Sequence, residues 1–229
     1  MNSISVIITA YNREAYLAEA IESVLAQTRP AAEIIVVDDG STDRTGEIAR
    51  SYPQVTYVAQ ENQGIGGARN TGVARATGDL LAVLDSDDAW TPRKLELQAA
   101  ALELHPELDF VFCHMKPFLS PEIDPASRPR FDEREIVACN AGGVLGRRQA
   151  FDRLGLFPTD RSIPEFVPWF SRAGDAGLKH IILPEVLLLR RVHLTNTVHR
   201  ADIKSGYARI LKQRLDEKRA AAAKEAAGS

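Results

Sequence analysis

The sequence predicts one large α/β domain on a mixed, mainly parallel β-sheet flanked by helices, followed by a C-terminal helical tail. Short apolar runs alternate with amphipathic segments through roughly residues 3–115, which is the pattern of strands joined by crossover helices. Polar clusters follow several of these runs directly, and the clearest is Asp85-Ser86-Asp87-Asp88 after Leu80–Leu84. Carboxyl ends of parallel strands meet at one edge of an open sheet, where ligands bind. The clusters therefore predict one shared site.

Each strand expected in the first half is a short run rich in β-branched residues and leucine. These runs are residues 3–9, 34–37, 55–58, 80–84 and 110–113. The helices expected between them span 13–27 with Asn12 as the cap, 44–51 with Thr42 or Asp43 as the cap, and 91–104. Pro92 suits the first turn of the last helix, where its missing N–H needs no partner. Residues 64–76 predict a glycine-containing loop that leads into a helix.

The pattern changes after Lys116. Residues 117–135 contain four prolines and many charges, which predicts a surface loop. The remaining expected elements are helices at 147–154 and 165–173, short strands at 181–183 and 186–189, and an amphipathic helix from Asp202. We therefore divide the chain into a domain, residues 1–199, and an amphipathic tail, residues 200–229.

Composition narrows the function classes. The net charge is −3, so nothing global indicates a nucleic-acid partner or a membrane surface. No apolar run is long enough to span a bilayer and no signal-like segment opens the chain, so a cytoplasmic location is the default expectation. Cys113 and Cys139 lack metal-ligand spacing and are expected to be reduced core or near-core thiols.

The tail differs from the rest of the chain in charge. Residues 200–229 contain eight Lys/Arg and four Asp/Glu, a net charge of +4. Their apolar stripe is short and lacks Trp or Phe anchors, so we expect it to pack on the domain or on a second copy in a homodimer. Peripheral membrane contact is the less favoured alternative.

Three carboxylates within four positions are costly to bury together, because anions repel one another and lose hydration. Core packing does not call for Asp85, Asp87 and Asp88 after an apolar strand. A hard divalent cation, Mg²⁺ or Mn²⁺, held there with the phosphates of a nucleotide explains them economically. The alternative is a solvated acidic turn or a helix cap.

Three other segments follow expected strands. They are Thr9-Ala10-Tyr11-Asn12, Asp38-Asp39-Gly40-Ser41 and the glycine-containing segment 64–70. The second is by itself a common turn sequence, whereas glycines in the third let the backbone approach a ligand closely. Arg69 and Asn70 then offer a cation and an amide to a base or phosphate. The alternative for Arg69 is a surface ion pair.

Together these segments resemble the nucleotide-sugar-binding half of the family 2 glycosyltransferases, which have a GT-A (Rossmann-like) fold. The resemblance rests on Ser5–Asn12, Ile35–Asp43, Asn62-Gln63-Gly64 with Ala68-Arg69-Asn70, and Leu84–Asp88. It continues more loosely through Gly143–Leu145 with Arg147-Arg148, Gly155-Leu156-Phe157 and Arg190–His193, and so covers roughly residues 3–196. It implies that residues 1–116 bind the nucleotide sugar and that residues 117–199 form the acceptor and catalytic half.

The resemblance implies a role for each matching residue of the donor site. Contacts with the nucleobase, typically uracil, fall to Thr9, Ala10, Tyr11 and Asp39. Arg69 is implied to lie near the base or the phosphates. Asp85, with its neighbour Ser86, is implied to face the ribose or the sugar.

The same resemblance implies a metal site. Asp87, the last residue of the Asp-x-Asp element, binds Mn²⁺ or Mg²⁺ that bridges the diphosphate, and Asp88 shares this role or orients the loop. His193 is a further metal ligand, with Arg190 or Arg191 on phosphate, and a structural histidine is the alternative. A cation there is chemically sensible, because the departing nucleoside diphosphate develops negative charge.

The chain departs from the family pattern at the expected general base. Many relatives place Glu-Asp on a helix after the Gly-Phe segment, with Asp as the base, whereas here the pair is Glu165-Phe166. An inverting transfer needs a base for the acceptor hydroxyl, and Glu165 is the candidate. Its alternative is a first-turn acid that complements the helix dipole. Asp160 and Asp175 are the fallback candidates.

We therefore expect a metal-dependent glycosyltransferase that moves a sugar from a nucleoside-diphosphate donor, typically UDP-linked, to an acceptor hydroxyl with inversion. Phe166 raises the alternative of a nucleotide-sugar-binding protein impaired in catalysis. A nucleotidyltransferase is disfavoured, because Ala10–Glu14 is not a glycine-rich phosphate loop. Trp169 and Phe170 either pack in the core or form an apolar platform for the acceptor or the sugar.

No motif in the sequence identifies the acceptor. The candidates are a saccharide, a lipid carrier, a peptide and a small metabolite.

Overall fold

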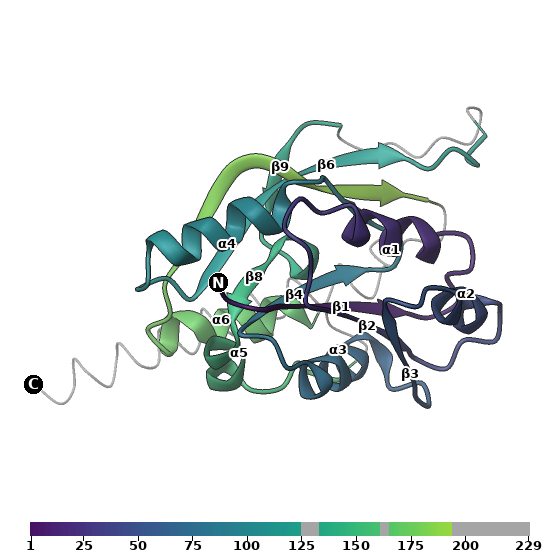
Figure 1. Cartoon of the computed structure of the whole chain (residues 1–229), viewed down its shortest axis with the longest axis horizontal. Helices are drawn as coiled ribbons and strands as arrows, with labels where there is room; N and C mark the ends of the chain where they lie inside the picture. The colour runs from purple at the N-terminus through teal and green to yellow at the C-terminus, as the bar shows by residue number, and fades with distance from the viewer. Residues whose placement is uncertain (125–132, 161–164, 194–229) are drawn as a thin grey trace, which may run out of the picture.

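The computed structural model describes residues 1–124, 133–160 and 165–193, which form one nine-stranded sheet with helices on both faces (Figure 1). The strand order is β3-β2-β1-β4-β8-β6-β9-β5, and β7 pairs with β6 off this path. The expected α/β class is confirmed.

The N-terminal half builds the parallel part of the sheet. Its strands are β1 (Ile4–Ala10), β2 (Glu33–Asp38), β3 (Val55–Ala59) and β4 (Leu80–Asp85). The helices between them are α1 (Leu17–Leu25), α2 (Thr45–Ser51) and α3 (Gly64–Arg75). Every residue of β1 is buried, as expected for a central strand that is covered on both faces.

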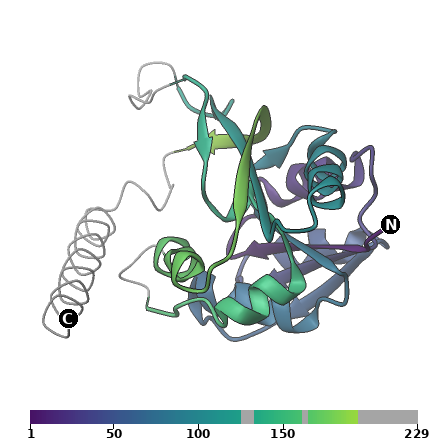
Figure 2. The same ribbon diagram turned by 90° about the vertical axis from the view of Figure 1, so that its left-hand side faces the viewer.

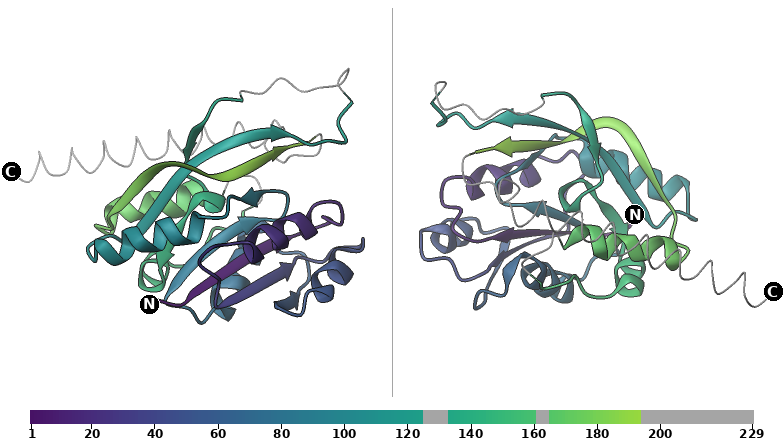
Figure 3. Two further views of the ribbon diagram at one scale, coloured as in Figure 1. Left: turned by 45° about the horizontal axis from the view of Figure 1, so that its top comes forward. Right: turned by 180° about the vertical axis from the view of Figure 1, so that it is seen from behind.

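The second half adds antiparallel pairs. Its elements are β5 (Ala89–Trp90), α4 (Lys94–Leu104), β6 (Phe110–Leu119), β7 (Ile136–Ala138), the 3₁₀ turn η2 (Ala141–Gly143), β8 (Leu145–Arg147), α5 (Arg148–Leu154), α6 (Phe166–Asp175) and β9 (His180–Val192). Strand β8 joins the two halves, because it pairs antiparallel with both β4 and β6. The long strands β6 and β9 run parallel and lie side by side in both views of Figure 3.

Alternate residues of the central strands face two separate cores, as the period of two in a strand requires. Val6 and Ile8 of β1 pack with α1, α2 and α4, whereas Ile7 packs with α3, α5 and α6. Figures 1 and 2 show α4 on one side of the sheet and α5 and α6 on the other. The carboxyl ends of β1, β2 and β4 therefore meet between two helical layers.

Some expected boundaries were wrong. Helix α1 begins at Leu17 rather than after Asn12, whose backbone adopts a conformation incompatible with a helix start. Residues 64–67 form the first turn of α3 rather than a loop. The two short strands expected near residues 181–189 are one strand, because register shifts opposite His114 let the pairing continue past Pro184. Such irregularities are characteristic of bulges.

Other expectations fall partly outside the described residues. Of the expected loop at 117–135, residues 117–119 belong to β6 and residues 125–132 are not described. The tail expected at 200–229 is also outside the described part of the chain. Cys113 is buried as expected, whereas Cys139 is exposed. None of the helices within the described ranges is long and apolar enough to cross a membrane.

Helix α4 buries a lysine completely. The Nζ of Lys94 donates to Gln98 Oε1 at 2.8 Å and to the carbonyl oxygen of Val144 at 3.3 Å, and lies 4.0 Å from the centre of the Trp90 ring. Burial lowers the pKa of Lys94 from 10.5 to about 8, because the charged form loses hydration.

We predict that this lysine makes the stability of the protein pH-dependent. Between pH 8 and pH 10.5 the unfolded chain binds more protons at Lys94 than the folded chain does, so the free energy of unfolding rises with pH in that window. Relative to Lys94→Met, the wild type should gain roughly 2–3 kcal/mol between pH 7 and pH 10. Urea unfolding across this range measures the difference.

Lys179→Met, at an exposed position, is the matched control: it keeps Lys94, so its difference in stability from the wild type should stay constant across this pH range. A difference between wild type and Lys94→Met that stays constant from pH 7 to pH 10 would show that the Lys94 pKa is not lowered.

Candidate functional site

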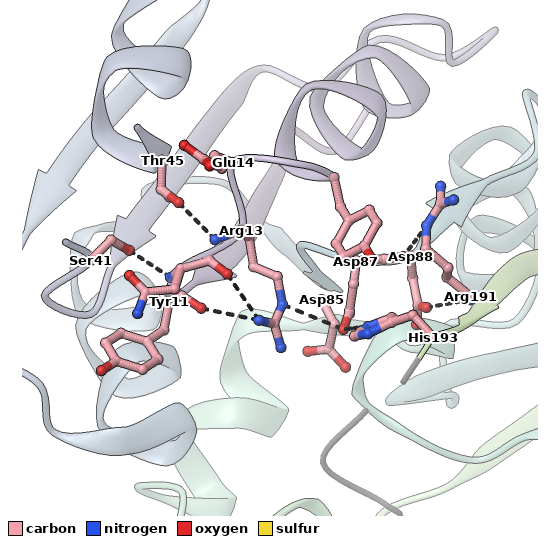
Figure 4. Close-up of polar contacts among 12 residues, drawn as sticks. Tyr11, Arg13, Glu14, Ser41, Thr45, Asp85, Asp87, Asp88, Arg191 and His193 are labelled. Carbon is pink, nitrogen blue, oxygen red and sulfur yellow. Dashed lines mark hydrogen bonds and ion pairs between the residues drawn. The ribbon is translucent and has the colours of Figure 1, made fainter. Parts of the chain in front are cut away.

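The carboxyl ends of β1, β2 and β4 bring the expected polar segments side by side. In the sheet register, Thr9 lies opposite Asp85 and Ala10 lies opposite Asp38. The residues after β1 and the turn after β4 therefore face each other, as Figure 4 shows. His193, which directly follows β9, reaches the same place from the other half of the sheet.

A tight turn after β1 directs Tyr11 and Arg13 to this edge. Asn12 between them has a φ of +51°, which asparagine tolerates better than most residues. Its backbone N donates to Ser41 Oγ at 2.9 Å, and its Oδ1 accepts from Thr42 N at 2.8 Å. The Asn12 side chain therefore fixes the turn to the loop after β2 and does not cap α1.

Among four of the residues expected to contact the nucleotide sugar, one is exposed and three are buried at the edge of the sheet. The Tyr11 residue is 47% exposed, so its ring is available at the edge of the sheet. Thr9, Ala10 and Ser86 are buried, at 6%, 3% and 4% exposure. These three shape the floor of the site.

Asp87 is the centre of the polar contacts. Its Oδ2 lies 2.9 Å from His193 Nε2 and 3.6 Å from Arg13 Nε. Burial by itself raises the pKa of Asp87, but the hydrogen bond with His193 and the charge of Arg13 outweigh it and hold the pKa below its usual value. The structure thus brings Asp87 and His193 together as expected, and adds Arg13, which the sequence did not single out.

Asp88 faces the interior. Its Oδ1 accepts from Arg191 N at 2.9 Å, and burial, with the charges of Asp87 and Asp85, raises the pKa of Asp88 well above its ordinary value. Arg191 is 3% exposed, donates from Nε to the carbonyl oxygen of Asp87 at 3.0 Å and lies over the Tyr16 ring. These contacts orient the acidic turn, one of the two roles expected for Asp88, and they occupy the guanidinium of Arg191, one of the two arginines expected on phosphate.

Two of the three expected metal ligands lie at ligand spacing. Adjacent ligand atoms of an octahedral Mg²⁺-like ion lie about 3 Å apart, and Asp87 Oδ2 and His193 Nε2 are 2.9 Å apart. Across residues 1–124, 133–160 and 165–193, no three His, Cys, Asp or Glu side chains gather around one point. The expected set of Asp87, Asp88 and His193 is therefore not assembled. The pair fits a divalent cation whose remaining positions are filled by ligand or water oxygens.

Asp39, expected on the nucleobase, anchors helix α3. Its carboxylate accepts hydrogen bonds from Gln63 N and Gly64 N, both at 2.8 Å, and from Gln60 Nε2 at 2.7 Å. It complements the dipole at the start of α3, and about one of its four acceptor positions is left. Within the described residues, Gln60 Oε1 and Thr9 Oγ1 are buried without a hydrogen-bond partner. Such atoms are rare unless a ligand or water completes them.

Arg69 is buried and joins two carboxylates. Its Nη2 lies 2.6 Å from Asp85 Oδ1, its Nη1 pairs with Glu165 Oε1, and its side chain is 2% exposed. The alternative of a surface ion pair is therefore wrong. The charge of Arg69 holds Asp85 and Glu165 in fixed positions.

Glu165 directly precedes α6, is 9% exposed and directs its carboxylate to Arg69. Phe166, at the position where the family resemblance leads us to expect Asp, packs in the core, with ring centroids 5.6 Å from Trp169 and 5.7 Å from Phe170. The core interpretation of these aromatic residues thus holds. Asp175, one of the fallback bases, lies at the opposite end of α6.

Helix α3 contacts Phe157 and Pro158, which precede Glu165 in the chain. Asn70 Nδ2 donates to the carbonyl oxygen of Phe157 at 3.0 Å, and Asn70 Oδ1 accepts from Phe157 N at 2.7 Å. A Cβ on Gly66 would overlap the carbonyl oxygen of Pro158, so only glycine allows this close approach. Asn70, expected on base or phosphate, instead ties the two halves together.

Known proteins similar to this chain are glycosyltransferases. The sequence profile of glycosyl transferase family 2 matches residues 5–155. An uncharacterized glycosyltransferase of Rickettsia prowazekii is 43% identical over 221 residues, covering 86% of this chain and 66% of the relative. One from Nostoc is 49% identical over 98 residues, covering 41% of this chain and 30% of the relative. The chain thus spans only part of the length of these relatives.

Two solved structures share the fold. Staphylococcus aureus TarS 1–349, crystallised with UDP-GlcNAc, aligns with a TM-score of 0.71 and 24% identity over 87% of this chain and 61% of TarS. The mannosyltransferase PcManGT of Pyrobaculum calidifontis, with GDP-Man and Mn²⁺, aligns with a TM-score of 0.66 and 23% identity, covering 85% of this chain and 58% of that one. The likeness confirms the GT-A type of fold.

We predict that Arg69 stabilises the site by holding both carboxylates. Arg69→Met should lower the free energy of unfolding at pH 7 by roughly 3 kcal/mol, because two buried or half-buried carboxylates lose their cation. Urea unfolding measures this. Arg44→Met, which removes an arginine whose side chain is 74% exposed, should cost less than about 0.5 kcal/mol. Equal losses in the two variants would contradict the structural role of Arg69.

Proposed function

The chain belongs to glycosyl transferase family 2, and from that membership we propose that it transfers a sugar from a nucleoside-diphosphate donor to an acceptor hydroxyl with inversion. The observation that carries the proposal is the convergence of Asp87, His193 and Arg13 at the carboxyl ends of the parallel strands. Together they form a site for a divalent cation and an anion where open α/β sheets bind ligands.

The nucleobase would lie against the segments that follow β1 and β2. Tyr11 offers an exposed ring there, and the buried, unpaired Thr9 Oγ1 and Gln60 Oε1 offer polar contacts to a base or ribose. TarS was crystallised with UDP-GlcNAc and PcManGT with GDP-Man. We propose a UDP-linked donor, with a GDP-linked donor as the alternative.

Asp87 and His193 would hold the cation, Mn²⁺ or Mg²⁺, together with oxygens of the donor. When bound, such a cation neutralises the charge that develops on the departing diphosphate. Asp88 and Arg191 keep the acidic turn in place, because they bond across to β9. Asp85 stays fixed through Arg69 and presents its half-exposed carboxylate to the ribose or sugar.

Glu165 would accept the proton of the acceptor hydroxyl while the hydroxyl oxygen attacks the sugar carbon from the face opposite the diphosphate. The ion pair with Arg69 fixes this carboxylate relative to Asp85. The acceptor, the expected homodimer and the role of the tail remain predictions.

A second candidate function is a donor-binding protein with impaired catalysis. The observation that favours it is Phe166, which packs in the core at the position where the family resemblance leads us to expect a catalytic Asp. This candidate keeps donor binding and loses transfer, so the two candidates differ in chemistry but not in binding.

We predict cation-dependent binding of a nucleoside diphosphate. Calorimetry with UDP and GDP should show binding that is stronger with Mn²⁺ than with EDTA. Asp87→Asn should weaken binding with Mn²⁺ about tenfold or more, because a charged ligand is lost, and should change binding in EDTA little. Asp152→Asn, at an exposed position on α5, is the control. Binding that is unaffected by Mn²⁺ and by Asp87→Asn would contradict the proposed donor site.

We predict that Glu165 is the general base. Glu165→Gln should slow turnover of the donor about a hundredfold, the low end of the usual general-base contribution, and should weaken UDP binding much less. Release of UDP from a UDP-sugar measures turnover without a known acceptor, and a thermal-shift screen of nucleotide sugars with Mn²⁺ selects the donor. Asp175→Asn should retain turnover. If the wild type binds the donor and releases no UDP even with candidate acceptors, the impaired protein is the better description.

A further inference from the structure

The Arg13 side chain is held inside the proposed donor site from several directions. Its Nη1 donates to the carbonyl oxygens of Tyr11 and Asn12, at 3.3 Å and 3.0 Å, and its Nε lies 3.6 Å from Asp87 Oδ2. Its backbone N donates to Thr45 Oγ1 at 2.7 Å. Figure 4 shows the guanidinium extended from the turn after β1 toward Asp87. The left-handed backbone of Asn12 therefore directs the Arg13 guanidinium toward the acidic turn.

In this position the positive charge of Arg13 would repel a metal ion bound to Asp87. A divalent cation on Asp87 would lie within a few ångströms of the guanidinium, a distance at which like charges repel strongly near a protein surface. The Arg13 side chain is 21% exposed and that of Asp87 17% exposed, so water screens this repulsion only in part. Arg13 therefore disfavours a cation that binds alone.

An anion between the two cations reverses the effect. Phosphate oxygens can bind the metal on one side and the planar guanidinium on the other, and arginine matches phosphate geometry well. In the described part of the chain, the contacts of Arg13 use Nη1 and Nε, which leaves Nη2 for such an oxygen. The backbone carbonyls already fix the side chain, so little rotamer entropy is lost on binding.

We propose that Arg13 is a diphosphate-binding residue that couples cation binding to donor binding. Without donor, its charge partly neutralises Asp87 and lowers affinity for the cation. With donor, it binds the diphosphate directly beside the cation. This inference rests on the proposed function, because it assumes that a nucleoside diphosphate occupies the site.

The test measures two affinities of the full chain, for Mn²⁺ alone and for UDP with Mn²⁺, which we expect to shift in opposite directions. Arg13→Gln keeps a donor for the Tyr11 and Asn12 carbonyls and removes the charge. Mn²⁺ binding without nucleotide, followed by electron paramagnetic resonance, should become about fivefold tighter. UDP binding with saturating Mn²⁺, followed by calorimetry, should become about tenfold weaker. Uridine, which has no phosphate, should bind both proteins equally.

Two further variants separate charge from structure. Arg13→Lys should keep the weak binding of Mn²⁺ alone and recover UDP affinity in part, since it restores a charge without the planar fork. Arg44→Gln, which removes a neighbouring exposed arginine that pairs with Glu14, should match the wild type in both assays. Thermal melting of each variant checks that it folds.

The outcomes are distinguishable. Opposite shifts in the two affinities, with uridine unchanged, support the coupling. Shifts in the same direction, no shift, or an equal loss of uridine and UDP overturn it, because they indicate a role confined to the turn. If the wild type binds neither UDP nor GDP with Mn²⁺, the proposed function fails and the inference about Arg13 fails with it.

Discussion

The buried guanidinium of Arg69 is the link on which the geometry of the site depends. It binds Asp85 at the end of β4 and Glu165 at the start of α6, and these residues come from opposite halves of the domain. A buried arginine strongly destabilises a protein unless opposite charges compensate its own charge. The two carboxylates therefore have to stay in place for the fold to persist. Stability and site geometry are set by the same ion pairs, so the candidate base cannot move independently of the donor edge.

Other residues of the site also stabilise the fold. Asp39 anchors the start of α3, and Asp88 binds the backbone of β9. Each uses a carboxylate to satisfy backbone N–H groups that would otherwise be buried unpaired. The carboxylate of Asp87 differs from those of Asp39 and Asp88, since its partners His193 and Arg13 are side chains that a cation and an anion can replace. Within the acidic turn, Asp87 is therefore the carboxylate to which we assign the proposed cation.

Local patterns allowed the parallel strands and the acidic turn to be predicted, because strand periodicity and strand-end polarity are encoded within a few residues. The convergence of Asp87 with His193 was implied only by the family resemblance. The position of Arg13 was not predicted, since nothing in its neighbours distinguishes it from a surface arginine in the first turn of a helix. The burial of Arg69 likewise depends on contacts with residues 16 and 96 positions away in the sequence. The single strand β9 was missed because Pro184 indicates an interruption that bulges in the pairing overcome.

The replacement of the expected Asp by Phe166 has a geometric consequence for any transfer reaction. Successive residues of a helix point about 100° apart, so Glu165 cannot occupy the place that an Asp at position 166 would take. Here position 166 faces the aromatic core, with Trp169 and Phe170, and position 165 faces Arg69. An acceptor hydroxyl activated by Glu165 would therefore have to approach from the side of Arg69 and Asp85. If Glu165 is the base, its position predicts a direction of approach that differs from the one an Asp at position 166 would allow.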